Sequence, residues 1–142
     1  MSQIGYTEIT PALKTIFESV SQIAAVYAHP QTKYSKYPSL VFRPAGLASE
    51  FDTTTQNKDV YEYEVYIIVG QTRGKTQSQL WEQVMPKVFD AVNKALAAGW
   101  DIAVAGRTTL QVVGGDWVPD NGQDGYMVVA NMRIIITTLN SN

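Results

Sequence analysis

The segment from Val60 to Val69 constrains the fold most strongly, because large apolar side chains recur at every second position along it. Successive side chains of a β-strand point to opposite faces of a sheet, so this period of two predicts a strand. One face would carry Tyr61, Tyr63, Val65, Ile67 and Val69, and the other Glu62, Glu64, Tyr66 and Ile68. The first set is typical of a protein core. The segment therefore predicts a sheet with one core face and a second face that mixes charged and apolar groups.

A first amphipathic helix is predicted over residues 10–24. Thr10 can cap its N-terminus, and Pro11 suits the first helical position. Apolar residues then recur at helical spacing and form one stripe: Leu13, Ile16, Phe17, Val20 and Ile23. We expect this stripe to cover the core face of the sheet.

A second, longer helix is predicted over residues 76–98. Thr76 and Gln79 have the spacing of a capping box, and Gly99 is placed to act as the C-terminal cap. Its broad apolar stripe consists of Leu80, Trp81, Val84, Met85, Val88, Phe89, Val92 and Leu96. Pro86 lies inside this helix and is expected to kink it or to split it in two, because proline lacks the backbone donor.

Further strands are expected before the second helix. A short extended segment over residues 26–28 precedes a strand over 38–43, which we expect Pro44 to end. Residues 45–59 are rich in small and polar side chains, and we interpret them as a hairpin arm with a flexible tip.

The C-terminal third is predicted to be a β-hairpin. One strand covers residues 107–118, with a bulge at Gly114 and Gly115, and the other covers 126–139. The turn between them, over 119–125, is rich in Asp, Asn and Gly, which are the residues that tight turns favour.

These elements predict one α+β domain over residues 1–142. Its sheet is mixed but mainly antiparallel, two amphipathic helices lie on one face, and a β-hairpin arm projects from it. The other face would carry Glu64, Tyr66, Ile68, Asn131, Arg133 and Ile135. A face that mixes polar with large apolar groups is often a contact surface in an assembly.

Composition favours protein contacts over nucleic-acid binding. The 142 residues are 45% hydrophobic and only 17% charged, and the formal net charge is −2. No Lys- or Arg-rich block supplies the positive patch of a dedicated nucleic-acid binder. The absence of cysteine excludes disulfides and thiolate metal sites and fits folding in the cytosol. We also expect no signal peptide and no membrane span.

The segment Gly70–Thr76 comes closest to a catalytic motif. It follows a strand and opens a helix, as a phosphate-binding P-loop does. Such a loop needs four residues between its glycines, whereas only three separate Gly70 from Gly74. Asp116 is a poor candidate for the acidic Mg²⁺ partner. We therefore interpret the segment as a tight turn followed by a capped helix.

Other candidate sites also favour structural roles. The segment 120–125 is similar to a calcium loop, but Gly122 and Asn131 occupy two ligand positions, so a hairpin turn is the better interpretation. Glu62 and Glu64 would share a strand face about 7 Å apart, with no pocket implied. We interpret three further groups as loop, core or interface residues: His29, the pair Tyr34 and Tyr37, and the tryptophans Trp81, Trp100 and Trp117. We expect no catalytic residue, cofactor or metal.

The order of elements, with several short motifs, resembles the tail terminator and tail-completion proteins of long-tailed bacteriophages. The motifs are Val26-Tyr27, Tyr37-Pro38-Ser39, Glu50-Phe51-Asp52-Thr53, Asn57, Tyr61-Glu62-Tyr63-Glu64-Val65 and Phe89-Asp90-Ala91-Val92. The resemblance covers most of the chain by element order, and the C-terminal hairpin matches only in general shape.

The resemblance implies a virion protein that assembles in the host cytoplasm. Such proteins are not enzymes; they form a ring, commonly a homohexamer, that caps the tail tube, stops its polymerisation and meets the head connector. DNA would pass through the lumen without specific binding. A ring needs two different contact patches on each subunit, and we assign the 44–59 arm to one and the second sheet face to the other. The candidate interface residues are Phe51, Asp52, Glu62, Glu64, Tyr66, Asn131 and Arg133.

Three alternatives remain open from the sequence. A head-completion or neck protein of the same particle would cap a different partner. A small nucleotide-binding enzyme would use the segment Gly70–Thr76 and would lose ATP binding on Lys75→Ala. A dimeric small-ligand domain would show a pocket and a dimer in place of a ring.

Overall fold

A computed structural model describes residues 5–29, 37–51, 56–70, 76–103, 108–122 and 125–141. The elements, in chain order, are α1 (Tyr6–Glu18), β1 (Ala25–Tyr27), β2 (Ser39–Phe51), β3 (Gln56–Gly70), α2 (Gln77–Gln79), the π-helical turn η1 (Leu80–Val84), α3 (Met85–Ala103), β4 (Thr108–Val113), β5 (Trp117–Gly122) and β6 (Gly125–Ser141). The chain is an α+β protein with a mixed, mainly antiparallel sheet, as the sequence predicted.

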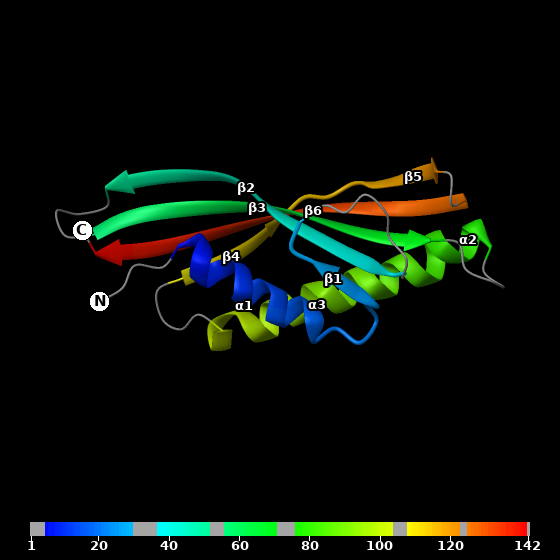
Figure 1. Cartoon of the computed structure of the whole chain (residues 1–142), viewed down its shortest axis with the longest axis horizontal. Coiled ribbons are helices and arrows are strands. Elements are labelled where there is room, and N and C mark those ends of the chain that lie inside the picture. Colours follow the sequence, from blue (N-terminus) through cyan, green and yellow to red (C-terminus); the bar gives the residue numbers. More distant parts are fainter. Residues whose placement is uncertain are drawn as a thin grey trace.

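The sheet is built around three long strands. Its order is β1-β2-β3-β6-β4, and β5 also pairs with β6. Among the described strands, only the pair β1 and β2 runs parallel. Because β6 has 17 residues, one part of it pairs with β4 and another part with β5. The end of β2, the start of β3 and the end of β6 continue past α1 as a projecting arm, at the left of Figure 1.

The projecting arm confirms the predicted hairpin of residues 45–59. Strands β2 and β3 stay paired out to Phe51 and Asn57. The expected flexible tip, at 52–55, lies outside the described residues. Pro44 does not end β2, as we expected; the strand passes through it with a register shift between Pro44 and Gly46. A bulge on an outer strand accommodates proline, because no ladder hydrogen bond is lost there.

Both long helices lie on the same side of the sheet (Figure 1). Their apolar stripes and the core-facing strand residues form one buried cluster, which includes Ile9, Leu13, Phe17, Val88, Val92, Leu96, Tyr63, Val65, Ile67, Met132, Ile134 and Ile136. The core face of β3 predicted from the alternation is therefore confirmed. Burial of these side chains stabilises the fold by about 25 cal/mol for each Å² of apolar surface that it removes from water. This burial is the main force that holds the layers together.

Tyrosines anchor α1 at the base of the arm. The ring of Tyr6 meets Tyr61 and Tyr63 edge-on, with ring centroids 4.7 and 5.7 Å apart. The hydroxyl of Tyr6 donates to the carbonyl of Gly46, inside the β2 bulge. The Tyr63 hydroxyl is hydrogen-bonded to Thr10 Oγ1 at 2.8 Å. Burial of Tyr63 raises its pKa to about 12.

The first helix starts and ends earlier than we expected. It runs from Tyr6 to Glu18, so Pro11 lies inside it and Thr10 is not its cap. Burial of Ile9 extends the apolar stripe toward the N-terminus. The Gly5 N–H donates to Glu8 Oε2 at 2.8 Å, which satisfies a donor that the helix leaves free.

The second helix changes its winding next to Pro86, where we expected a kink or a split. The predicted capping box is confirmed: the Gln79 N–H donates to Thr76 Oγ1 at 3.3 Å, and the Thr76 N–H donates to Gln79 Oε1 at 2.8 Å. A π-helical turn then precedes α3 and Pro86; the wider winding suits a residue without a backbone donor. Gly99 is not the C-terminal cap, because α3 continues to Ala103.

Gly99 serves close helix packing instead. A side chain there would place its Cβ atom 3.3 Å from Ile16 Cγ1 of α1. The missing side chain therefore lets the two helices approach each other.

A bulge of one extra residue separates β4 from β5 and exchanges the faces to which the following side chains point. The strand predicted over 107–118 divides into β4 and β5 at Gly114 and Gly115. Val113 pairs with Arg133 and Trp117 pairs with Ala130, so three residues on this side oppose two on β6. The odd residue moves Trp117 to the core side, because side chains alternate. There its ring centroid lies 6.4 Å from that of Trp81 and 5.7 Å from that of Phe89.

We predict that the two glycines of this bulge respond differently to alanine. A Cβ atom on Gly115 would lie 2.2 Å from the backbone carbonyl oxygen of Asn131, so Gly115→Ala should destabilise the fold by about 2 kcal/mol or more. Gly114 has φ +61° with open space around it, so Gly114→Ala should cost about 1 kcal/mol. Urea unfolding measures both. Equal losses would contradict this account of the bulge.

We also predict an alkaline loss of stability that depends on Tyr63. Its folded pKa of about 12 exceeds its ordinary value of 10.0, so its contribution is present below pH 10 and falls as pH rises toward 12. Tyr63→Phe should weaken this alkaline loss and, at neutral pH, cost about 1 kcal/mol for the missing hydrogen bond to Thr10. Denaturant titrations from pH 8 to pH 12 test the prediction, and an unchanged alkaline slope would refute it.

Candidate functional site

The candidate site is the sheet face opposite α1 and α3, which we call the open face. Pairing registers place its residues in rows across the strands. Arg43, Glu64, Arg133 and Val113 form one row. Tyr66 and Asn131 lie opposite each other in the next row, and Glu62 and Ile135 do so on the other side.

Five of the seven predicted interface residues come together on this face. Glu62, Glu64, Tyr66, Asn131 and Arg133 all belong to it by register. Their side chains are half-buried on β3 and exposed on β6.

The remaining two predicted residues belong to the arm. Phe51 ends β2, at the far end of the arm. Asp52 lies outside the described residues. The open face and the arm are therefore two separate regions of one sheet.

Charges on the open face are partly neutralised within it. Arg43 Nη2 donates to Glu64 Oε2 at 2.6 Å, and the Tyr66 hydroxyl donates to the same oxygen at 2.8 Å. These hydrogen bonds, first from Tyr66 and then from Arg43, lower the pKa of Glu64 below its ordinary value. The side chain of Arg43 is 47% exposed and that of Glu64 20%, so solvent screens the pair and its contribution to stability is small.

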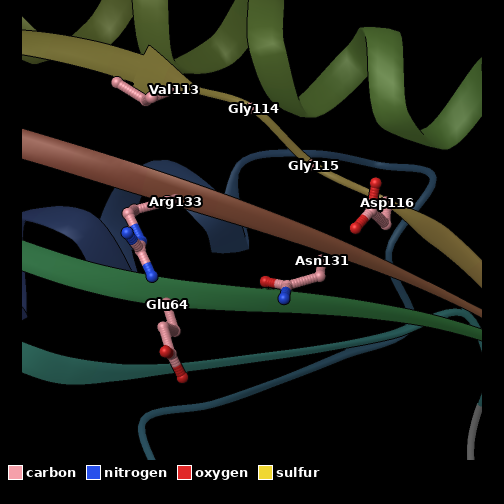
Figure 2. Close-up of a pocket in the computed structure, with 7 residues that line it drawn as sticks. All are labelled: Glu64, Val113, Gly114, Gly115, Asp116, Asn131 and Arg133. Atoms are coloured by element: carbon pink, nitrogen blue, oxygen red, sulfur yellow. The ribbon is translucent and has the colours of Figure 1, made fainter.

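An open groove of about 270 Å³ lies beside this network (Figure 2). It is lined by Glu64, Val113, Gly114, Gly115, Asp116, Asn131 and Arg133. Figure 2 shows Arg133 between Val113 and Glu64, in the order that the register gives. The Asn131 N–H donates to the Asp116 carbonyl at 2.8 Å and closes the bulge at the end of the groove.

Arg133 gives the groove a cation. It pairs with no carboxylate within the described part of the chain, although its charge helps to lower the pKa of Glu64. The described residues contain no cluster of three His, Cys, Asp or Glu side chains that could hold a metal. The groove can offer hydrogen bonds, a positive charge and an apolar wall to a partner surface.

One end of the open face is covered. A Cβ atom on Gly70 would lie 2.8 Å from the ring of Tyr37, so this ring rests directly on the strand. On the same face, Val41 and Ile68 are buried. Ile68, which we expected among the contact residues, is therefore part of the protein interior, and along β3 the face becomes partly exposed at Tyr66.

Sequence reasoning missed three exposed valines at the margin of the sheet. Among the described residues, the exposed large apolar side chains are Val112, Val113 and Val118. They lie on β4 and β5, on either side of the bulge. The alternation of this ribbon is broken by the extra residue, so its faces could not be assigned from sequence. The one available signal was the absence of any charge from Thr108 to Val113.

The other candidate motifs lie elsewhere. Gly70 ends β3 and Thr76 caps the second helix, while 71–75 lie outside the described residues. The hairpin interpretation of 120–125 is confirmed, since Gly122 pairs with Gly125 across the β5–β6 turn. His29 is exposed after β1.

The aromatic candidates also separate. Trp81 and Trp117 pack on the core, whereas Tyr34 and the side chain of Trp100 lie outside the description. No described helix has the length and apolarity needed to span a membrane.

We predict that Tyr66 and Arg43 both hold down the pKa of Glu64. Tyr66→Phe and Arg43→Met should each raise the pKa of Glu64 toward its ordinary value of 4.5, because the first removes the hydrogen bond from Tyr66 and the second removes a hydrogen bond together with a positive charge. Because the folded pKa is lowered, the stability that Glu64 contributes is present above pH 4.5 and is lost as pH falls through the folded value. Carboxyl NMR titration measures both shifts. An unchanged pKa of Glu64 in either variant would contradict the network.

Comparison with known proteins adds no relative. No family model matches the chain, and no curated protein matches it.

Proposed function

We propose that this chain is a structural assembly protein, a tail terminator of a long-tailed bacteriophage. It would form a closed ring that caps the tail tube, stops its polymerisation and presents the joining surface for the head connector. The observation that carries the proposal is the open face: a broad part of the central sheet has charged, aromatic and apolar side chains and no helix layer over it. The order of elements along the chain supplies the specific form of the assembly.

The shape of the molecule fits a ring subunit. A ring is closed by heterologous contacts, in which one patch of each subunit meets a different patch of the next. The arm and the open face supply two such patches, because the arm projects beyond the helices at one end of the molecule (Figure 1). A two-fold dimer would need only one self-complementary patch.

Charge and area are also compatible with association. The charges of Arg43 and Glu64 neutralise each other, so the open face carries little net charge to repel another copy. Tyr66 and Asn131 add uncharged polar groups that cost less to desolvate than ions. A standard interface takes about 800 Å² from each partner. The surface of 8061 Å² can supply two such patches and still leave most of the molecule free.

We predict that the purified protein arrests the growth of tail tubes. Tube subunits polymerising in its presence should give shorter tubes with an extra ring at one end, as seen by electron microscopy. Glu64→Arg should abolish ring formation, because the new cation would share one row with Arg43 and Arg133 and the row would then hold three cations.

The matched control is Glu18→Arg, which makes the same charge change at an exposed position at the end of α1. This variant should keep both ring formation and capping. Unchanged tube lengths with the wild-type protein would overturn the proposal. Capture of the head connector without any effect on tubes would point to the neck protein instead.

A further inference from the structure

The outer edge of β4 is built to receive another strand. Strand β4 lies at the end of the sheet order and pairs only with β6 among the described elements. An outer strand presents a row of unpaired N–H and C=O groups, which proteins usually protect with charges, proline or a covering segment. From Thr108 to Val113 the sequence has no charged residue and no proline. Its neighbour β5, in contrast, carries Pro119 and Asp120.

Both faces of β4 are also open at its end. Val112 lies level with Ile134 on the helix side but is 37% exposed, and Val113 lies on the open face and is 39% exposed. The helix layer thus stops short of this margin. An added strand would satisfy the backbone groups of β4 and would cover an apolar side chain on each face of the sheet at once.

The opposite margin of the same half of the sheet is free as well. Strand β1 pairs with only the first three residues of β2, Ser39 to Val41. Beyond Val41, β2 pairs with β3 on one side and, within the described residues, with no strand on the other. This half of the sheet therefore has two different outer edges, at β2 and at β4.

Strand directions make these two edges compatible. From one edge to the other the strands are β2, β3, β6 and β4, and each strand is antiparallel to the next. Outer strands of such a four-stranded unit run in opposite directions. When a copy is rotated about an axis along the strands, its β2 therefore meets β4 of its neighbour in antiparallel orientation, which continues the ladder.

We propose that the partner of β4 is a second copy of this chain, whose β2 adds to it as an antiparallel strand, with Arg43 and Pro44 level with Val113 and Val112. This inference rests on the proposed self-assembly and specifies its contact: the subunits join edge to edge, so the arm of one copy meets the β4 margin of the next, and the part of the open face beside Arg133 lies at the rim of the joint. The same geometry explains why Val112 and Val113 remain exposed in the single copy.

A lysine scan separates strand addition from general stickiness. Val112→Lys and Val113→Lys should raise the concentration needed for assembly about tenfold or more, because an added strand must bury or displace the new charge. Val118→Lys is the matched control: Val118 is more exposed, at 52%, but lies on β5. Equal weakening by all three variants would overturn the inference. Circular dichroism checks that each variant is folded.

Cysteine cross-linking identifies which edge meets β4. The chain has no native cysteine, so introduced thiols are unique. Gln111 is exposed on β4 and lies level with Gly46, next to the exposed Ala45 on β2. With a short thiol cross-linker, the double variant Gln111→Cys, Ala45→Cys should give a ladder of covalent oligomers. Each single variant should give none.

The outcomes distinguish this inference from the proposed function. Covalent dimers from Gln111→Cys alone would show two-fold β4 pairing and overturn the β2–β4 joint. Rings that form without any cross-link in the double variant would also overturn it and leave the capping function intact. A ladder in the double variant, together with tubes that grow unchecked, would support the joint and reject the tail-terminator role.

Discussion

The packing of α1 and α3 onto one face of the sheet is the interaction on which the rest of the structure depends. Alternation along β3 and β6 sends one set of apolar side chains toward the helices, where residues such as Tyr63, Val65 and Met132 are buried. The same alternation forces the other set outward, onto a face that no helix covers. The open face is therefore a direct consequence of the core, since both long helices of the described part of the chain lie on one side of the sheet.

The bulge at Gly114 and Gly115 links the core to the margin of the sheet. Its extra residue lets Trp117 join Trp81 and Phe89 under the sheet, while Val113 stays on the open face. Without that residue, Val113 and Trp117 would lie on the same face, so either Trp117 would leave the core or Val113 would leave the open face. The bulge also shapes the groove beside Arg133 and ends β4, so one local irregularity positions both the aromatic packing and the exposed edge.

Local patterns predicted most of the fold. The period of two over Val60–Val69, the helical stripes, the capping box at Thr76 and the arm of residues 45–59 depend on near neighbours, and each was readable from the sequence. The prediction failed where contacts between residues distant in sequence set the limits of a helix. Burial of Ile9 moves the start of α1 toward the N-terminus, and close packing against Ile16 accounts for a glycine at position 99 inside α3. Alternation predicted which residues lie on the open face, but it did not predict that Ile68 is buried there. The exposed edge at Val112 and Val113 was not predicted, because it depends on where the helix layer stops.

The structure combines a helix-covered core face, an open face with balanced charge, and two outer strands, β2 and β4, that run in opposite directions. We propose from these features that the single chain is an incomplete unit that closes on copies of itself. Light scattering on the purified protein, across a range of concentrations, tests this most directly. A closed ring predicts a single species with a mass several times the 15.7 kDa of one chain. A 15.7 kDa monomer at every concentration would contradict it.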